Sequence, residues 1–542
     1  MTKQSPNLLL HRFARWLVIH RADLLALAFL VALGIQYLNG IMQVYDLELF
    51  DETDFLYTGI HLLQTGLRDP SWGPLYALWY FLISPLAPDR ISLFYLNIYF
   101  IILLPVLALY IFLRTNQVSL WWSWASAVLL MTIATNLLAE HRAEHMALLC
   151  LLVGLIFASR ARSTLGALVD VTLGALAAMY CRPEHTITFF VLVLVLIALF
   201  LRQWSKEHRA QRVAVVGTFA VMGLALWGIG NPLSSPLSAW HSYEAFSQHF
   251  TVNWLTHYPN GMDPWTSGAS IMPQFFPTAQ TIPQAMMENP GAFAQHLRWN
   301  LTLLVKGFAT GPFTTFFYTP VFGRQYEILL FAAFALLFIF RNKTLLTNLK
   351  QRPVVVLTLV CAWTVVVLSS LVTMPRPTFL FLPIAFSLAL IVVLVAGGAA
   401  GRSPALWQIG VVGLLTLAFI PSVGSIRAGK PPRLAATRYL SQLNIRKPVT
   451  LLSPLGKIGD YFSDDYNYVL IEAIRGQEFK TFLQDQNINM VITTPHFEQD
   501  PRYQSSPAWN QFLTHPADFG FVERDIPGTQ YKLYLANSLL SR

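Results

Sequence analysis

Long apolar runs recur along most of this chain, and they limit what it can fold into. Hydrophobic residues make up 54% of its 542 residues and charged residues only 12%, whereas an average soluble domain is about 25% charged. A helix that crosses a bilayer needs about 20 predominantly apolar residues. The sequence therefore predicts an α-helical polytopic membrane protein with about eleven transmembrane helices and a small C-terminal extramembrane α/β domain.

The predicted spans follow from this length rule, although three of them are short for a span. In chain order they are 23–42, 92–113, 118–135, 146–159, 164–181, 186–201, 213–230, 326–340, 353–372, 378–398 and 404–421. The short ones are 146–159, 186–201 and 326–340. No small-residue cleavage pattern follows the first run, so we expect that run to remain as a signal anchor.

Basic residues set the expected orientation. Lys and Arg gather in the N-terminal tail and in alternate short loops such as 202–212 and 341–352, and such an excess is typical of cytoplasmic loops. We therefore expect a protein of the plasma (inner) membrane with a cytoplasmic N-terminus and a periplasmic or extracellular C-terminus. This distribution matters more than the formal net charge of +9, and the expected partners include membrane lipids but no nucleic acid.

Two long external loops and a change of composition divide the chain. The loops at 43–91 and 231–325 belong to a transmembrane domain over 1–425, and a periplasmic mixed α/β domain follows over 426–542. Aromatic residues suit the headgroup level of a bilayer. Interfacial or re-entrant pieces are accordingly predicted at 53–66, 74–84 and 291–305.

Turn residues and apolar runs predict a small sheet in the last domain. Strands are expected at 448–453, 489–494, 522–525 and 530–536. Helices are expected at 477–486 and 506–514.

Three acids, Asp51, Glu52 and Asp54, stand just beyond the first predicted span. Acidic side chains so close to a bilayer are costly and tend to mark a reaction or transport site. On a helix, Asp51 and Asp54 would share a face and Glu52 would point elsewhere. Acids in a first helical turn also serve as caps, which is the structural alternative. A base must lie within reach of the proton it takes, and we predict Asp51 and Glu52 as catalytic residues.

Further polar residues on the same side of the membrane are candidates for substrate binding. They are Asp54, Tyr57, Tyr76, His141, Arg142, Glu144, Arg182, Glu184, Arg298, Lys306 and Arg376. Arg binds phosphate oxygens with two parallel hydrogen bonds. Arg142, Arg182 and Arg376 could therefore supply positive charge where a phosphate leaving group becomes negative. Arg298 and Lys306 could meet a lipid phosphate, although snorkelling side chains explain them equally well.

Three short motifs together resemble a known superfamily. The first runs from Asp51-Glu52-x-x-Phe55-x-Tyr57 to Trp72-Gly-Pro-Leu-Tyr76, the second is Arg142-Ala-Glu144, and the third is Arg376-Pro-Thr-Phe-Leu-Phe-Leu-Pro383. They resemble the GT-C superfamily of integral-membrane glycosyltransferases, in particular protein O-mannosyltransferases and lipid A aminoarabinose transferases. One departure is Phe55, which stands where members often carry Tyr.

The resemblance implies a polyprenyl-phosphate-linked sugar as the donor and a glycan, lipid or protein hydroxyl as the acceptor. It implies that Asp51 deprotonates this hydroxyl, that Glu52 supports it or a bound ion, and that a single displacement inverts the anomeric configuration. Some members need a divalent cation. Two carboxylates could hold Mg²⁺ or Mn²⁺ with water and phosphate, but nothing in the sequence demands a cofactor. His141 and His145 alone are a weak zinc signal, so no metal ligands are predicted.

Three other functions remain open. A transporter or flippase for lipid-linked sugars would carry polar residues deep within its spans and repeat its halves, whereas here the ionisable groups gather at one face, with Asp170 as the main exception. An O-antigen ligase or polymerase would rely on Arg and His of a late external loop. A non-catalytic membrane scaffold would tolerate the loss of Asp51.

Overall fold

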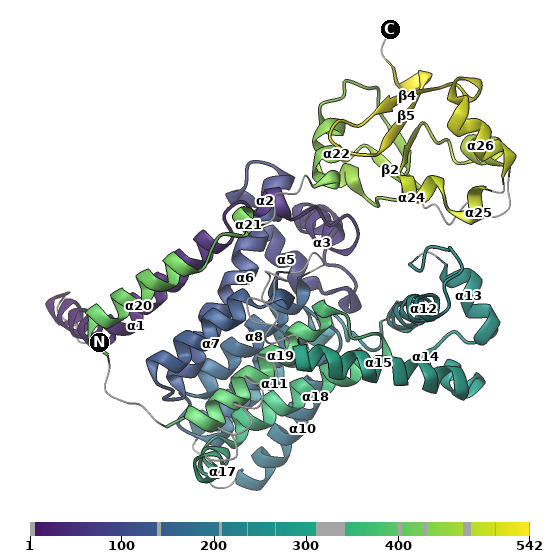
Figure 1. The fold of residues 1–542 in the computed structure, drawn as a ribbon. Helices are drawn as coiled ribbons and strands as arrows, with labels where there is room; N and C mark the ends of the chain where they lie inside the picture. The colour runs from purple at the N-terminus through teal and green to yellow at the C-terminus, as the bar shows by residue number, and fades with distance from the viewer. Residues whose placement is uncertain are drawn as a thin grey trace.

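The fold is a bundle of helices that carries a small sheet at one end (Figure 1). The computed structural model describes residues 6–137, 142–204, 209–235, 237–265, 267–310, 342–398, 404–426, 431–469, 478–504 and 506–540. The helices of the bundle are α1 (Pro6–Tyr37), α6 (Arg90–Thr115), α7 (Leu120–Thr132), α8 (Ala143–Ala158), α9 (Thr164–Met179), α10 (His185–Gln203), α11 (Arg209–Gly228), α17 (Asn342–Gln351), α18 (Pro353–Val372), α19 (Pro377–Ala396) and α20 (Leu406–Phe419).

Seven helices within the described residues are long and apolar enough to cross a membrane. They lie in α1, α6, α10, α11, α18, α19 and α20. The predicted count of about eleven spans is not confirmed, because α7, α8 and α9 are apolar but shorter than the length that a span requires. The predicted span at 326–340 lies outside the described residues. The coarser prediction, a helical protein with several membrane-spanning segments, agrees with these helices.

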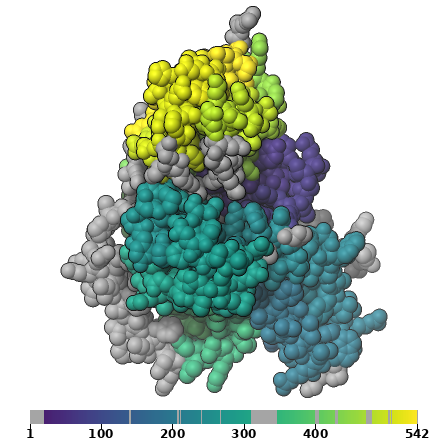
Figure 2. Space-filling model, turned by 90° about the vertical axis from the view of Figure 1, so that its right-hand side faces the viewer, coloured from purple at the N-terminus to yellow at the C-terminus, as the bar shows by residue number. Residues whose placement is uncertain are grey.

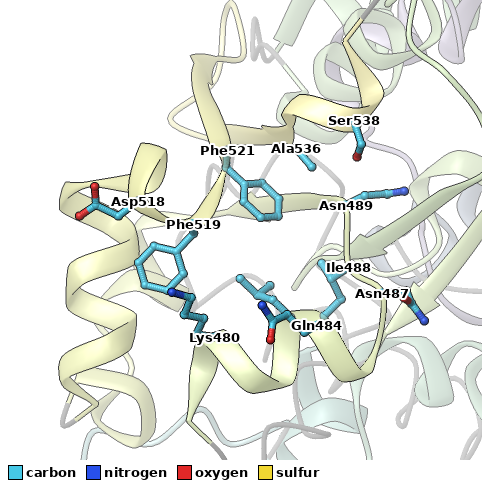
Figure 3. A pocket seen from close by; sticks show the side chains of 11 residues that line it. Lys480, Gln484, Asn487, Ile488, Asn489, Asp518, Phe519, Phe521, Ala536 and Ser538 are labelled. Atoms are coloured by element: carbon cyan, nitrogen blue, oxygen red, sulfur yellow. The ribbon is translucent and has the colours of Figure 1, made fainter.

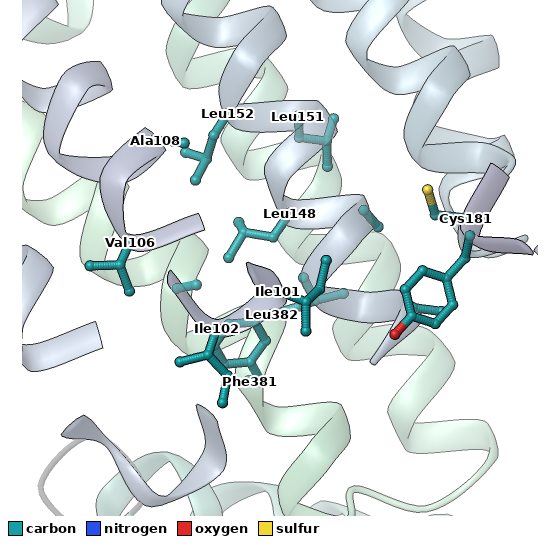
Figure 4. Packing of buried hydrophobic residues seen from close by; sticks show 14 of the residues in the cluster. Ile101, Ile102, Val106, Ala108, Leu148, Leu151, Leu152, Cys181, Phe381 and Leu382 are labelled. Carbon is teal, nitrogen blue, oxygen red and sulfur yellow. The ribbon is translucent and has the colours of Figure 1, made fainter. Parts of the chain in front are cut away.

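The centre of the bundle lies where α6, α8 and α19 meet (Figure 4). Each helix contributes side chains that are no more than 1% exposed: Ile101, Ile102 and Val106 from α6, Leu148, Leu151 and Leu152 from α8, and Phe381 and Leu382 from α19. A helix that is apolar on every side is a buried one. The apolar residues of the short helix α8 are therefore explained by burial against neighbouring helices as well as by contact with lipid.

Two glycines allow α8 and α9 to pack with their backbones in contact. A Cβ added at Gly154 would lie 3.0 Å from the Cα of Gly174 and 3.0 Å from the carbonyl oxygen of Asp170. Small residues at such crossings let membrane helices approach closely. The pair α8–α9 matters for function because α8 starts, and α9 ends, beside the polar residues described below.

We expect Gly154→Val to lower the free energy of unfolding by about 1–3 kcal/mol, because overpacking displaces a backbone that cannot yield. Thermal unfolding in detergent, followed by tryptophan fluorescence, measures the change. Gly217→Val on α11 is the matched control, since a Cβ there meets nothing within 4 Å. Equal melting temperatures for the two variants would contradict the close packing of α8 and α9.

Two sets of helices lie outside the bundle, at the end that carries the sheet (Figure 1). The first set is α2 (Ile41–Val44), α3 (Asp51–Ile60), α4 (Leu62–Thr65) and α5 (Pro74–Ile83), with the 3-10 turns η1 (Pro70–Trp72) and η2 (Ser84–Leu86). The second set is α12 (Ser238–His257), α13 (Gly268–Phe275), α14 (Ile282–Glu288) and α15 (Pro290–Thr310). The second set has its own apolar core, which includes Phe246, Phe250, Phe276 and Phe293.

The C-terminal domain is a five-stranded sheet with helices around it. Its strands are β1 (Val449–Leu452), β2 (Tyr466–Val469), β3 (Met490–Thr493), β4 (Phe521–Asp525) and β5 (Lys532–Ala536), in the spatial order β2-β1-β3-β5-β4. Strands β2, β1 and β3 run parallel, and β5 pairs antiparallel with both β3 and β4. The helices are α22 (Pro432–Ser441), α23 (Phe479–Asp485), α24 (Pro495–Glu498), α25 (Pro501–Gln504) and α26 (Pro507–Thr514), with 3-10 turns η4 (Ile458–Tyr461), η6 (Pro516–Phe519) and η7 (Asn537–Leu539).

The four predicted strands and two predicted helices of this domain appear at their expected places as β1, β3, β4, β5, α23 and α26. Two elements are not among those predicted. Strand β2 is an edge strand whose only buried residue is Tyr466, and helix α22 precedes the sheet. Seen from the side, the segment α12–α15 lies directly below this domain (Figure 2).

Candidate active site

Helix α3 begins at Asp51, as the acidic pattern indicates. The side chain of Glu48 accepts hydrogen bonds from the backbone N–H groups of Phe50, at 3.1 Å, and Glu52, at 2.7 Å. An acceptor in this position satisfies N–H groups that a helix start leaves unpaired. Glu48 therefore caps the helix, and the carboxylates of Asp51, Glu52 and Asp54 have other partners.

Glu52 points into the protein and is only 1% exposed. One carboxylate oxygen accepts hydrogen bonds from the Tyr76 hydroxyl at 2.6 Å, from the Tyr80 hydroxyl, and from the side-chain amide of Asn97 at 2.9 Å. The other accepts the backbone N–H of Arg142 at 3.0 Å. Burial raises the pKa of Glu52, against the lowering effect of these donors and of the Arg142 charge. The residue joins α3, α5, α6 and the start of α8.

Arg142 lies on the same buried side and is only 2% exposed. Its guanidinium donates to the carbonyl oxygen of Asn136 at 3.0 Å and to the hydroxyl of Tyr45, and its charge also lies 5.1 Å from the centre of the Tyr45 ring. These contacts give Arg142 a structural role, and its role as a phosphate ligand stays a prediction.

Arg182 lies among carboxylates just before α10. Its guanidinium forms ion pairs with Glu144 at 3.4 Å and with Glu184 at 2.9 Å. Burial opposes the charged form, but Glu144, Glu184 and Asp51 together raise the pKa of Arg182 above its usual value. Three residues predicted from separate loops, Asp51, Glu144 and Glu184, thus lie close to one guanidinium.

Arg376 approaches the same place from the N-terminus of α19. Its guanidinium carbon lies 4.7 Å from the centre of the Phe379 ring and 5.1 Å from that of Trp265, while the guanidinium carbon of Arg182 lies 5.7 Å from the Phe379 ring. A cation at such a distance from the face of an aromatic ring is attracted to it electrostatically. The two arginines thus share one aromatic ring, and Pro375 and Pro377 stiffen the turn that presents Arg376.

The turn before α5 brings Trp72 to this cluster. Gly73 has a φ of +62°, and a Cβ there would lie 2.6 Å from the carbonyl oxygen of Cys181, so a side chain would force the turn away from the segment that carries Arg182. The backbone N–H of Leu75 donates to the carbonyl oxygen of Tyr180 at 3.0 Å. Residues 72–75 are thereby fixed beside residues 180–182.

Helix α12 completes the surroundings of Asp51 with two residues that the sequence analysis did not select. His241 stacks on Trp72, with ring centres 4.1 Å apart and planes inclined by 15°. Burial lowers the pKa of His241, and the Asp51 charge partly offsets this effect. Burial also raises the pKa of Glu244, and Asp51 adds to the rise. Only the aromatic and polar composition of loop 231–325 hinted at this contribution.

The remaining predicted site residues lie elsewhere. Asp54 forms ion pairs with Arg68 at 3.2 Å and with Lys457 of the C-terminal domain, and the Tyr57 ring packs on His61, 4.3 Å between centres. Tyr76 binds Glu52, as described above. Arg298 and Lys306 are exposed on α15, and His141 lies outside the described residues.

The side chains of Asp51 and Glu52 point in different directions, which affects whether the two carboxylates could bind one divalent cation together. Both oxygens of Glu52 already accept hydrogen bonds, so a cation shared with Asp51 would have to break them. Within the described residues, no three His, Cys, Asp or Glu side chains are grouped as metal ligands. The Glu52 geometry does not fit the suggested Mg²⁺ or Mn²⁺ bridge between the two acids.

A separate cavity of about 730 Å³ opens on the C-terminal domain (Figure 3). Its lining comes from α23 and from the residues around β4 and β5, including Lys480, Phe519 and Phe521. None of the predicted site residues lines it.

Neither a scan against models of protein families nor a search of curated proteins finds a match to this chain. The class that the fold defines is a mostly helical protein with several helices long and apolar enough to cross a membrane and a small C-terminal sheet domain. A fold alone does not define a chemistry, which depends on the residues of the site.

Proposed function

We propose that this protein is a glycosyltransferase that moves a sugar from a polyprenyl-phosphate donor to an acceptor hydroxyl on a glycan, lipid or protein. The observation that carries the proposal is the grouping of Asp51 with Arg182, together with the sharing of Phe379 by Arg182 and Arg376. An acid that can take a proton thus acts electrostatically on Arg182, and Arg182 shares Phe379 with a second cation, Arg376. The proposed location is the periplasmic face of the plasma membrane.

The reaction is a single displacement at the anomeric carbon. The acceptor oxygen forms a bond to this carbon while the bond from the carbon to the phosphate oxygen breaks. The hydroxyl proton passes to the Asp51 carboxylate, and the electron pair of the broken bond leaves with the polyprenyl phosphate. Arg182 and Arg376 stabilise the negative charge that develops on the phosphate. Attack from the face opposite to the leaving group inverts the anomeric configuration.

The distribution of ionisable groups favours this proposal over a flippase for lipid-linked sugars. Such a transporter needs a polar path through the depth of the bilayer. Asp51, Glu184, His241 and Arg376 instead stand at helix ends or on external helices. An O-antigen ligase or polymerase is the second candidate. The electrostatic effect of Asp51 on His241 favours it, because such an enzyme would use residues of a late external loop, and His241 belongs to loop 231–325.

The test uses the purified full chain in nanodiscs with a panel of polyprenyl-phosphate sugars and candidate acceptors. Formation of a glycosidic bond with release of polyprenyl phosphate is the expected result, and the product should have the anomeric configuration opposite to that of the donor. Movement of intact donor across the bilayer without bond cleavage would replace the proposal with the flippase. Transfer from a polyprenyl-diphosphate glycan alone would favour the ligase.

We expect Arg376→Gln to raise KM for the donor about 10- to 100-fold, because one charge-assisted contact to a phosphate is worth about 1.5–3 kcal/mol. Initial rates over a range of donor concentrations measure it. Arg212→Gln is the matched control, because the Arg212 guanidinium lies over the Trp204 ring at 5.2 Å on the far side of the bundle from Asp51. An unchanged KM in Arg376→Gln would remove this residue from the donor site.

A further inference from the structure

The C-terminal domain touches the segment that leads into α3 at two places. The start of α22 contacts Asp46, which accepts the backbone N–H groups of Arg433 and Leu434, and residues 456–464, which we name the docking loop, contact the residues directly before Asp51. The backbone N–H of Lys457 donates to the carbonyl oxygen of Leu49 at 2.8 Å. The buried hydroxyl of Tyr461 donates to the carbonyl oxygen of Glu48 at 2.6 Å. Both acceptors belong to the three residues before Asp51, so the docking loop fixes the backbone from which α3 starts.

Gly456 makes this contact sterically possible. Its φ is +80°, and a Cβ there would overlap the carbonyl oxygen of Leu49. Only glycine adopts this left-handed conformation at no cost, and only glycine leaves room for so close an approach. The fit between the docking loop and Leu49 is therefore specific to the residue at position 456.

Side-chain charges hold the same surface together. Lys457 pairs with Asp54, one turn after Asp51 on α3. Asp464 pairs with Arg90 at 2.7 Å, at the start of α6, and with His61 at 3.2 Å, just after α3. Like charges three or four residues apart on a helix repel each other, so Lys457 and Arg68 together cancel a charge that would otherwise act on Asp51.

We propose that the docking loop positions the base of the active site, with Lys457 and Gly456 as its positioning residues for Asp51. The proposal rests on the proposed function, because it takes Asp51 as the base. Neither residue touches substrate. They act through the backbone of residues 48–50 and through Asp54. The C-terminal domain, which lies next to α3 (Figure 1), is thereby part of the catalytic unit.

The test compares four full-length proteins in nanodiscs: wild type, Lys457→Met, Lys457→Arg and Lys532→Met. Lys532 is the matched control, because it forms a comparable ion pair with Glu523, at 2.8 Å, within the C-terminal domain. We expect kcat of Lys457→Met to fall about 10- to 100-fold, as for a small displacement of a reacting group, with KM for the donor unchanged. Lys457→Arg should restore kcat, and Lys532→Met should behave like wild type.

Hydrogen exchange of the peptide that covers residues 46–56 gives a readout that does not depend on turnover. It should be faster in Lys457→Met and in Gly456→Ala than in wild type and Lys532→Met. If wild type is active and Lys457→Met has the same kcat as Lys532→Met, the proposal is overturned. It is also overturned if the kcat of Lys457→Arg is as low as that of Lys457→Met. A wild type that transfers sugar from no donor would sink the proposed function instead, and the exchange rates would still decide whether the loop holds α3.

Discussion

Asp51→Asn is expected to lower kcat about 10³-fold, within the 10²- to 10⁴-fold range of a general base, while the protein folds normally. The amide has the shape of the carboxylate but cannot accept the hydroxyl proton. Asp51 is half-buried at the start of α3, so the substitution disturbs little of the core. Transfer of a labelled sugar to the acceptor, measured at saturating donor, gives the ratio of rates.

Asp89→Asn provides the matched control. Asp89 is an exposed carboxylate that caps α6 by accepting the backbone N–H of Ser92 at 2.7 Å, and asparagine caps helices about as well as aspartate. Both proteins should melt near the wild-type temperature, and only Asp51→Asn should lose turnover. Turnover of Asp51→Asn at the level of Asp89→Asn would show that some other group takes the proton.

The positions of most helices follow from the sequence because apolar runs of sufficient length specify them. Helices α18 and α19 occupy the predicted segments almost residue for residue. The number of spans does not follow, because a short apolar run such as the one in α8 is compatible with burial among neighbouring helices as well as with lipid. Length alone cannot separate these two environments.

The candidate site divides in the same way. The sequence locates Asp51, Glu52 and Asp54 on one helix start, and helical geometry requires that Glu52 diverge from the other two. Where each points depends on elements far along the chain: Asp54 meets Lys457, and Glu52 meets Tyr76. No local pattern carries such information.

The arginines show the same limit. Arg142, Arg182 and Arg376 look equivalent in sequence because each stands at the end of an apolar run. Only packing distinguishes the buried Arg142, bound to Tyr45, from the two that share Phe379.

Glu52→Leu is expected to destabilise the protein by about 3–5 kcal/mol, because removing one member of a buried charged network leaves its partners uncompensated. The hydroxyls of Tyr76 and Tyr80, the amide of Asn97 and the backbone N–H of Arg142 would all lose their acceptor. Glu52→Gln should lower the free energy of unfolding by less, about 1–3 kcal/mol. Its carbonyl oxygen can still accept the hydrogen bonds made to one carboxylate oxygen, while its amide NH₂ replaces the other oxygen and faces a donor. Thermal unfolding in detergent gives the order Leu, Gln, wild type from least to most stable.

Asp89→Asn serves again as the control, because Asp89 is exposed and surface substitutions of this kind usually change stability by less than about 0.5 kcal/mol. A Glu52→Leu protein as stable as Asp89→Asn would show that Glu52 does not join the helices as described. If it instead melts early while the less damaged Glu52→Gln retains part of its turnover, Glu52 acts on catalysis through structure: it holds the start of α8, and with it Glu144 beside Arg182. The two adjacent carboxylates would then serve one site in different ways, Asp51 at the reacting atoms and Glu52 in the framework beneath them.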